Sequence, residues 1–300
     1  MENTISLEYE GPNNEPNITK KPDFSSKIDK LSLNDLLIIS DFDYTLTKRF
    51  SSSDEKTRTQ YLCGFGFYDH CPDISKSFKA EIEELKNKYI KYENDLSVPF
   101  ETRDKYTKLL YEEDLKLISK YNIPRNFLPK YLSNTIKNKP FYFRPGVKKF
   151  IDFIIEHKIL LIIISGGLKD AIETTLKILI GKELPENIKI ISNEFIYDQE
   201  DKIIDYKKPL IYTFNKSVIM SNRIKTIINE DEIKHKDILF MGDHINDIDA
   251  IKDLTPKNKV GIVFDNYFPQ YDYLEKYDCV IRDEGTFDVI NESLGKMKKI

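Results

Sequence analysis

The feature that most constrains this chain is a short apolar run that ends in two carboxylates, within residues 36–50 (LLIISDFDYTLTKRF). The aliphatic residues 36–39 are too few to span a membrane and are typical of a strand buried on both faces. Asp41 and Asp43 follow at once, with Phe42 between them. Two acids at the end of a buried strand repel each other unless a cation or a shared proton relieves them. Taken alone, the segment indicates either a site or an ordinary acidic turn.

Composition limits the kind of partner. The chain has 300 residues, 40% of them hydrophobic, which is enough for one large domain or a domain with a sizeable insertion. The net charge of −4 argues against a nucleic acid polymer as the main partner. No stretch resembles a signal peptide or a membrane span, and three cysteines without a CxxC pair indicate neither a disulfide framework nor a zinc site. We therefore expect a reduced, cytoplasmic, monomeric protein that binds a small molecule and no membrane.

Strands and helices alternate after residue 140. A second buried strand over 159–164 ends in Ser165-Gly166-Gly167, and a third over 237–241 ends in Gly242-Asp243. This alternation predicts an α/β fold, with a Rossmann-like, mostly parallel sheet and helices on both faces. The other expected elements are helices over 147–155, 169–180, 217–229 and near 274, strands over 188–192, 260–264 and 279–281, and a hairpin through 197–206.

A helical insertion separates the first strand from the rest. Over 74–133, apolar residues recur at three- and four-residue spacing between Glu and Lys, and three prolines interrupt the pattern. The first 30 residues are polar, with little periodicity. We expect a mobile or loosely docked tail over 1–30, a core domain over 31–57 and 139–300, and a helical cap domain over 58–138.

The strand ends predict a metal site. Ligands of parallel sheets bind beyond the carboxyl ends of the strands, so the three polar strand ends should converge on one rim. Asp41, Asp43 and Asp243 would offer oxygen ligands there, and Asp247 lies one helical turn beyond. Carboxylates without clustered histidines favour Mg²⁺ over zinc or copper. His244 is expected at the surface or behind the ligands.

The same rim offers an anion site. Ser165 brings a hydroxyl, and Gly166 and Gly167 leave backbone N–H groups open at a helix amino terminus. An ordinary strand-to-helix turn has the same residues, so both interpretations stand. Lys216 begins a helix and is better placed to face the rim than the two lysines at 207–208.

Together these parts suit one reaction. A carboxylate nucleophile, a second carboxylate two residues on, a Ser/Gly turn, a lysine and a metal-binding Asp follow one another in a fixed order. That set suits phosphoryl transfer through an aspartyl-phosphate. Mg²⁺ and the lysine would neutralise charge, and one carboxylic acid would protonate the leaving oxygen.

These residues resemble the haloacid dehalogenase superfamily. A closer similarity, over roughly residues 35–295, is to the cytosolic pyrimidine 5′-nucleotidase (5′-nucleotidase III) family. The segments that carry it are DFDYTLTKRF at 41–50, RPGV at 144–147, IISGGLKDAIE at 163–173, ISNEFIYDQE at 191–200, YKKPLIYTFNK at 206–216 and GDHINDI at 242–248.

The resemblance implies Mg²⁺-dependent hydrolysis of nucleoside 5′-monophosphates, with pyrimidines preferred, to nucleoside and phosphate. Asp41 would be the nucleophile, and Asp43 the general acid and base, reaching the metal through its backbone carbonyl. The phosphoryl group would be held by Ser165, Gly166 and Lys216, and the metal by Asp41, Asp43, Asp243 and, in support, Asp247.

The resemblance also implies that the cap reads the nucleoside. The family uses a cap glutamate and neighbouring aromatic residues for the base; here Glu112 is the candidate, and Tyr111 is the alternative. Three core positions depart from the family pattern: Gly166 stands for Ala, and His244 and Asn246 stand for Ser and Gly. The backbone contact at Gly166 should survive its change.

Two other functions fit the same core. One is a phosphatase or phosphotransferase of the superfamily that acts on another small phosphomonoester; the cap would decide between it and a nucleotidase. The other is a non-catalytic regulatory binding protein that keeps the fold. That function predicts loss of the nucleophile or a metal ligand, whereas Asp41, Asp43, Lys216 and Asp243 are all present.

Overall fold

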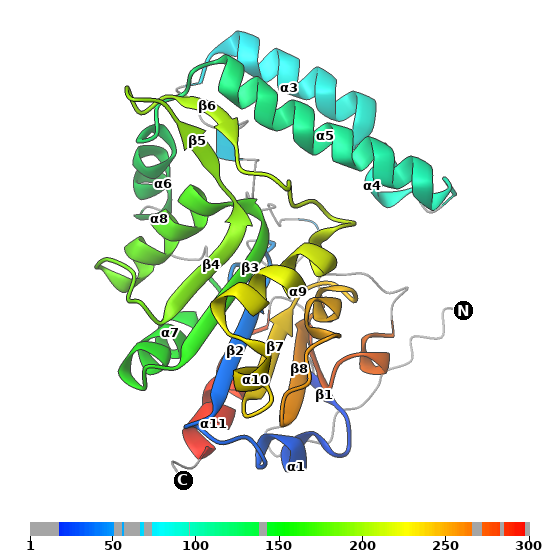
Figure 1. Cartoon of the computed structure of the whole chain (residues 1–300), viewed down its shortest axis with the longest axis vertical. Coiled ribbons are helices and arrows are strands. Elements are labelled where there is room, and N and C mark those ends of the chain that lie inside the picture. Colours follow the sequence, from blue (N-terminus) through cyan, green and yellow to red (C-terminus); the bar gives the residue numbers. More distant parts are fainter. Residues whose placement is uncertain are drawn as a thin grey trace.

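The strands that end in the predicted site residues lie side by side in one sheet. The computed structural model describes residues 18–50, 56, 67–68, 74–95, 97–137, 143–265, 272–282 and 285–297. Its main sheet has seven strands in the order β1-β9-β8-β7-β2-β3-β4 (Figure 1). Strand β2 (Leu36–Asp41) is parallel to both of its neighbours, β3 (Leu160–Leu168) and β7 (Asp237–Gly242). Their carboxyl ends therefore meet at one edge.

The outer strands extend this sheet in both directions. Strand β4 (Ile188–Asn193) is parallel to β3, β8 (Asn258–Phe264) is parallel to β7, and β9 (Cys279–Ile281) is parallel to β8. Only β1 (Ile18–Lys20) runs antiparallel, on the edge of β9. The predicted α/β fold with a mostly parallel sheet is confirmed.

Residues 18–30 differ from the loose tail that the sequence predicts. Strand β1 is paired along its whole length, and helix α1 (Phe24–Ile28) buries its first and last side chains in the core. The buried residues are Ile18, Phe24 and Ile28, and burying their apolar side chains stabilises the segment. The average composition of residues 1–30 does not reveal them, because the rest of the segment is polar. The prediction is wrong for 18–30, and residues 1–17 lie outside the described part of the chain.

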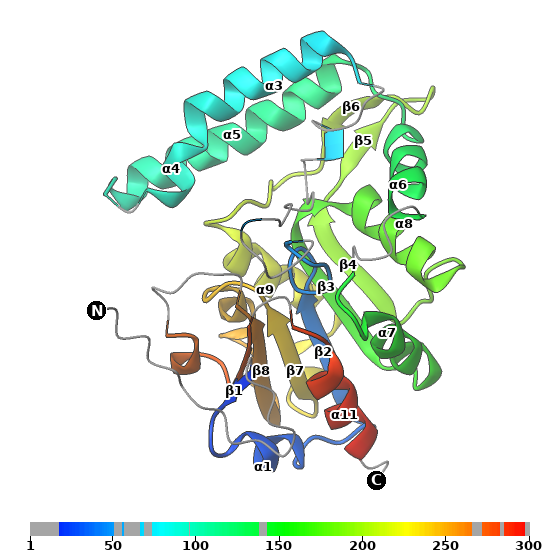
Figure 2. The same cartoon turned by 180° about the vertical axis from the view of Figure 1, so that it is seen from behind.

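Helices cover both faces of the sheet, as Figures 1 and 2 show from opposite sides. Side chains alternate along β2, since successive residues of a strand point to opposite faces. Its residues at 36 and 38 pack with α1, α7 (Val147–Glu156), α8 (Lys169–Ile180) and α11 (Asp288–Lys296). Its residues at 37 and 39 pack with α9 (Lys216–Ile227), α10 (Glu230–Ile233) and two 3-10 helices, η1 (Asp247–Ile251) and η2 (Tyr273–Glu275).

The insertion after β2 is helical, as predicted. Its helices are α3 (Lys76–Tyr89), α4 (Lys91–Asn94), α5 (Phe100–Lys120) and α6 (Phe127–Lys137). Helices α3 and α5 lie side by side and run antiparallel, because the start of α3 meets the end of α5 through the Glu81–Lys120 ion pair (Figure 1). Among the described residues, no helix combines the length and the apolar character needed to cross a bilayer.

The insertion shares a hydrophobic cluster with part of the core sequence. The predicted hairpin is present as β5 (Phe195–Tyr197) and β6 (Ile203–Tyr206), and it packs with α3, α5 and α6. Helix α6 also lies against α8. The hairpin falls within 139–300, yet in space it supports the insertion.

Candidate active site

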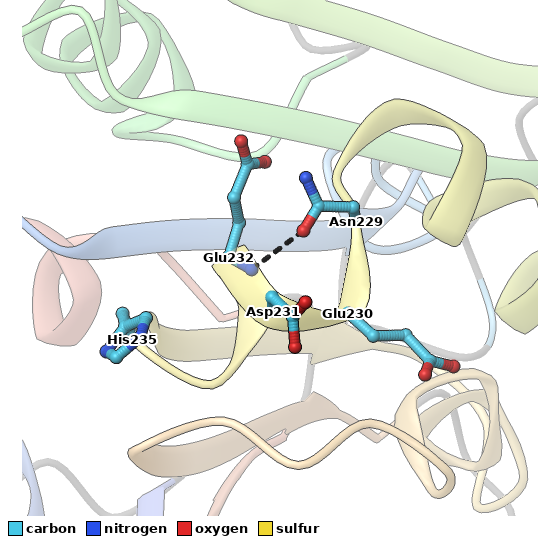
Figure 3. Close-up of a pocket in the computed structure, with 5 residues that line it drawn as sticks. All are labelled: Asn229, Glu230, Asp231, Glu232 and His235. Atoms are coloured by element: carbon cyan, nitrogen blue, oxygen red, sulfur yellow. Dashed lines mark hydrogen bonds between the residues drawn. The ribbon is translucent and has the colours of Figure 1, made fainter.

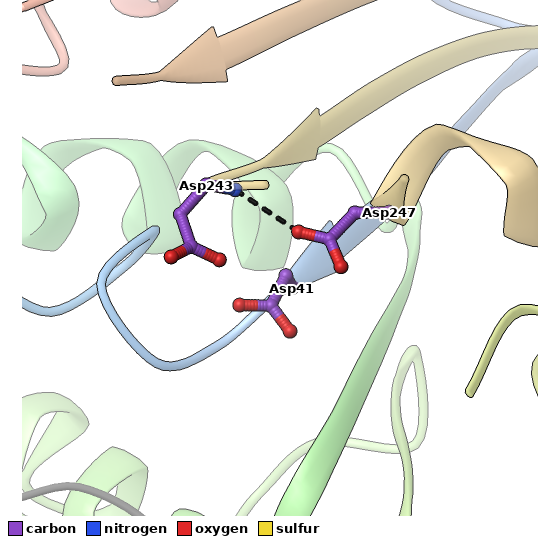
Figure 4. A group of neighbouring side chains, drawn as sticks. All are labelled: Asp41, Asp243 and Asp247. Atoms are coloured by element: carbon purple, nitrogen blue, oxygen red, sulfur yellow. Dashed lines mark hydrogen bonds between the residues drawn. The ribbon is translucent and has the colours of Figure 1, made fainter. Parts of the chain in front are cut away.

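Three aspartates gather at the carboxyl-end edge of the sheet. Asp41 ends β2, Asp243 directly follows β7, and Asp247 begins η1. One carboxylate oxygen of each lies within 4.8 Å of the others, and the three carboxylates surround a common centre (Figure 4). Asp41 is 3% exposed and Asp247 is 7% exposed. The sheet order causes this meeting, because β2 and β7 are neighbours.

The loop after β7 folds back so that Asp247 reaches the strand end. Its Oδ2 accepts hydrogen bonds from the backbone N–H groups of Asp243 and His244, at 3.2 and 3.0 Å. A Cβ on Gly242 would stand 2.8 Å from the Asp247 Cβ, so this approach requires glycine. The Tyr277 hydroxyl closes the loop by donating to the His244 carbonyl at 2.8 Å. His244 lies behind the cluster, as expected, and supports it through its backbone.

Lys216 joins the cluster from the first turn of α9. Its Nζ lies 2.5 Å from Asp41 Oδ1 and 2.9 Å from Asp247 Oδ1. By contrast, Lys207 is exposed and forms an ion pair with Glu194 at 2.8 Å. Of the lysines in this segment, Lys216 is thus the one brought to the rim.

Burial shifts the pKa values of the clustered carboxyl groups. It raises the pKa of Asp41 to about 7, against the opposing effect of the Lys216 ammonium. It also raises the pKa of Asp243 well above the usual value, with the Asp247 and Asp41 charges adding to the effect. For Asp247, burial acts to raise the pKa, but the charges of Lys216 and His244 and their hydrogen bonds to the carboxylate together lower it. With every group ionised, three carboxylates and one ammonium sum to a formal charge of −2, which a divalent cation would balance.

Asp43 points to a different part of the rim. Its Oδ2 accepts a hydrogen bond from Ser165 Oγ at 3.3 Å. Of the four predicted metal ligands, three carboxylates come together and the fourth turns toward the predicted anion turn. A role for Asp43 at the metal through its backbone carbonyl is compatible with this side-chain direction.

The anion turn follows the regular part of β3. Gly167 N–H donates to Ser165 Oγ at 2.8 Å, and α8 begins two residues later. A Cβ at Gly166 would meet no atom within 4 Å, so the Ala typical of the family would fit here. The Asn193 side-chain amide donates to the carbonyls of Gly166 and Ile211, both at 2.8 Å. Sequence reasoning missed Asn193, although it lies within a segment that carries the family resemblance.

The insertion contacts the segment just before Lys216. Tyr212 donates its hydroxyl to Asp104 Oδ1 of α5 at 2.7 Å, and Thr213 donates to the Glu93 carboxylate of α4. The ring of Phe214 meets Phe100 edge to face, with 5.4 Å between ring centroids. The helical insertion therefore holds three consecutive residues that lead into the lysine of the cluster.

The two predicted cap residues differ in their surroundings. The Tyr111 hydroxyl lies 3.3 Å from Thr213 Oγ1, so Tyr111 faces the core segment. Glu112 lies 3.8 Å from Lys108 on its own helix. The Glu93 carboxylate accepts a hydrogen bond from Thr213 of the core segment, and burial raises its pKa against the effects of Thr213 and Arg103. The residue spacing in α4 did not predict a role for Glu93, because Glu93 contacts Thr213, which is distant in the sequence.

A separate surface pocket lies at the other end of β7. Figure 3 shows its lining residues around α10, where Glu232 N–H donates to Asn229 Oδ1 at 2.9 Å. Helix α10 precedes the first residue of β7, whereas Asp243 follows its last. The pocket contains none of the predicted site residues and is remote from the chemistry at the rim.

The mostly parallel sheet with an aspartate cluster at its carboxyl-end edge is the arrangement that the sequence resemblance predicts. The crystal structure of cytosolic 5′-nucleotidase IIIB bound to cytidine superposes with a TM-score of 0.73 at 22% identity and covers 93% of each chain. A family model described as pyrimidine 5′-nucleotidase (UMPH-1) matches residues 44–298. The chain belongs to this family, whose members are phosphoric monoester hydrolases, and the predicted resemblance is confirmed.

Curated relatives extend the comparison. The 7-methylguanosine phosphate-specific 5′-nucleotidase of Drosophila melanogaster is 26% identical over 272 residues, 87% of this chain and 80% of that protein. The form A protein of the same name from Xenopus laevis is 28% identical over 263 residues, 85% of each chain. A Caenorhabditis elegans relative is 27% identical over 261 residues, and the match covers 66% of its length.

Proposed function

We propose that this chain hydrolyses nucleoside 5′-monophosphates to nucleoside and phosphate, with Mg²⁺ bound at the aspartate cluster. The observation that carries the proposal is the contact of Lys216 Nζ with both Asp41 and Asp247 at the meeting ends of β2 and β7. It places a cation beside a nucleophile candidate in a chain of a 5′-nucleotidase family.

Asp41 and Asp43 take different roles. The Asp41 carboxylate attacks phosphorus, so its oxygen–phosphorus bond forms while the bond from phosphorus to the nucleoside O5′ breaks. Asp43 donates its proton to O5′, and the nucleoside leaves. Water then attacks the aspartyl-phosphate, Asp43 takes a proton from that water, and phosphate leaves Asp41 free. The different partners of the two acids, Lys216 and Ser165, support this division.

The phosphoryl group is held between the two halves of the rim. Ser165 Oγ and the Gly166 backbone N–H contact its oxygens from β3, and the Lys216 ammonium contacts them from α9. Support comes from Asn193, which ties the Gly166 carbonyl to the strand beside it.

The proposed Mg²⁺ site consists of the carboxylates of Asp41, Asp243 and Asp247 and the backbone carbonyl of Asp43. The donor set consists of oxygen atoms, and burial, with the neighbouring carboxylate charges adding to it, raises the pKa values of Asp41 and Asp243, so a bound cation would stabilise their charged forms. Bound Mg²⁺ would supply charge neutralisation for the transferring phosphoryl group.

The insertion over 58–138 is the proposed cap, with 31–57 and 139–300 as the core. We infer that Tyr111 and Glu93 lie nearest to the nucleoside. Glu112 remains the cap glutamate that the family resemblance predicts to recognise the base. Pyrimidine nucleotides are the preferred substrates on this proposal, supported by the family name and the cytidine-bound relative.

A cytoplasmic location and a monomeric state stay predictions, the first supported by the cytosolic name of that solved relative.

A second candidate substrate is 7-methylguanosine 5′-monophosphate. The named specificity of the fly and frog relatives supports it. The Glu93 carboxylate and the Tyr111 hydroxyl both contact Thr213, and an acid together with an aromatic residue also suits a base that carries positive charge, because cations bind over aromatic faces and near acids.

One experiment separates these substrates. Phosphate release is measured for CMP, UMP, GMP, 7-methyl-GMP and a sugar phosphate, each with Mg²⁺ and with chelator. The proposal expects release from a nucleotide that stops on chelation and returns with Mg²⁺. Release from the sugar phosphate alone would refute the nucleotidase function and leave a phosphatase acting on another monoester. Release that ignores chelation would refute the metal site.

A further inference from the structure

A buried arginine holds the turn that carries Asp43. Arg144 is 2% exposed and lies just before α7. Its Nη2 and Nε both donate to the Tyr44 carbonyl, at 2.7 and 3.3 Å, and its Nη1 donates to the Gly285 carbonyl at 3.1 Å. Its guanidinium lies 4.4 Å from the ring centroid of Phe264. One planar group thus joins two distant segments of the chain.

The backbone at Tyr44 needs this support. Tyr44 has a φ of 62°, in the left-handed region that bulky residues rarely occupy. Such a conformation persists only where its surroundings hold it. The Tyr44 N–H donates to Thr47 Oγ1 at 2.9 Å, and the Arg144 N–H donates to the Leu46 carbonyl at 3.0 Å. The turn is thus held by Thr47 from within and by Arg144 from outside.

The turn at Tyr44 directly follows the two acids of the site in the sequence. Asp43 immediately precedes Tyr44, and Thr45 Oγ1 lies 3.4 Å from Asp41 Oδ2. A rotation at Tyr44 would therefore redirect the Asp43 carboxyl group first, whereas Asp41 belongs to β2 and is held by its neighbouring strand.

We propose that Arg144 is a positioning residue: it clamps the Tyr44 carbonyl to the carboxyl-terminal segment at Gly285 and so directs the Asp43 carboxyl group toward the leaving oxygen. The inference rests on the proposed function of Asp43 as the proton donor. Arginine is required because one planar fork can donate to both carbonyls at once, whereas a lysine ammonium has neither the fork nor its width.

The test compares two leaving groups in the full chain. Arg144→Lys should slow the first step with a nucleoside monophosphate, measured as nucleoside release in a single turnover, by about 10- to 100-fold, since the alkoxide leaving group needs the proton. The same variant should change nitrophenolate release from p-nitrophenyl phosphate in a single turnover by less than about threefold, because nitrophenolate leaves without that proton. Arg282→Lys is the matched control: Arg282 lies on the same carboxyl-terminal segment but forms an ion pair with Asp265 at 2.7 Å, and it should alter neither rate.

A second readout does not depend on turnover. Amide hydrogen exchange over residues 43–47 should quicken in Arg144→Lys and stay unchanged in Arg282→Lys. Equal losses on both substrates, or unchanged exchange over 43–47, would overturn the proposal. A wild-type chain that cleaves p-nitrophenyl phosphate but no nucleotide would instead refute the proposed substrate. The exchange measurement would still test the clamp. If Arg144→Lys does not fold, Arg144→Ala with added guanidinium ion supplies the same test, and absence of rescue would overturn the proposal.

Discussion

The rim of the sheet and the face of the insertion are built in different ways. At the rim, each functional side chain comes from a strand end or a helix start, and backbone groups of the core hold it in place. Asp247 is fixed by two N–H groups and Ser165 by one. The insertion reaches the core through long side chains, such as that of Phe100, which is 56% exposed. On the proposed function, the residues that carry the chemistry are held by the core, whereas those that select the substrate lie on the insertion and reach the core through side-chain contacts.

The strongest way to break this comparison is to remove the nucleophile at the rim. Asp41→Asn keeps the shape of the side chain and abolishes the carboxylate, so phosphate release should fall by at least about 1,000-fold for every substrate. Steady-state phosphate release and trapping of the phosphorylated chain measure the effect.

A matched aspartate supplies the control for that loss. Asp249 lies on η1 close to the cluster, but its carboxylate forms an ion pair with Lys276 at 2.9 Å. Asp249→Asn should retain activity within about threefold, as expected for a partly exposed ion pair. Activity of Asp41→Asn close to that of Asp249→Asn would contradict the role of Asp41.

The dependence of metal affinity on pH tests the electrostatics of the aspartate cluster at the rim. Because burial raises the pKa of Asp41 to about 7, its carboxyl group is protonated below that pH and must lose a proton to bind a cation. Mg²⁺ affinity should rise by up to about tenfold per pH unit as the pH approaches 7 from below, and level off above it. Calorimetric titration with Mg²⁺ at pH 6, 7 and 8 measures this trend.

The same shift has a consequence for the metal-free chain. A group whose pKa is higher in the folded than in the unfolded state contributes stability at low pH that is lost as the pH rises through the folded value. Thermal melts of the chelated chain should therefore show this contribution fading as the pH passes about 7, with Mg²⁺ restoring it. A melting temperature that ignores Mg²⁺ at pH 8 would count against the site.

A pair of cap glutamates tests the other side of the comparison. Glu93→Gln removes a charge that the core segment contacts, and it should raise KM for the preferred nucleotide by about tenfold with little change in kcat. Glu112→Gln removes a charge that pairs with Lys108 on its own helix, and it should change KM by less than about twofold. Kinetics on CMP and 7-methyl-GMP compare the two variants. The reverse order would restore Glu112 as the nucleoside-reading residue.

The smallest expected effect lies where the two regions meet. Tyr212→Phe deletes the hydroxyl that donates to Asp104, a single hydrogen bond between α5 and the segment before Lys216. One such bond contributes about 1 kcal/mol, so kcat/KM should fall by about three- to fivefold. Asp104→Asn provides the companion variant, and the double mutant should lose no more than the larger single loss if the two groups act as a pair.

Most of the fold follows from local patterns along the chain. The runs over 36–39, 159–164 and 237–241 are apolar without alternation, apart from Asp237, and they form the three central strands because both faces of a parallel sheet are covered. The tail shows the limit of this reasoning. Ile18 and the two ends of α1 are too few to show a period, and their burial depends on partners more than 200 residues away.

The order of strands and helices along the chain was enough to predict which side chains share one rim, because a strand end, a helix start and a glycine turn place the side chains that they carry. Asp41, Ser165, Lys216 and Asp243 could be assigned to one rim for that reason. The packing of distant segments settled which of Asp43 and Asp247 turns toward the cluster, that the Glu93 carboxylate bonds to Thr213 of the core segment, and that Arg144 bonds to the Tyr44 carbonyl. These outcomes depend on contacts between segments far apart in the chain, whose geometry is set by packing and leaves no period or spacing in the sequence.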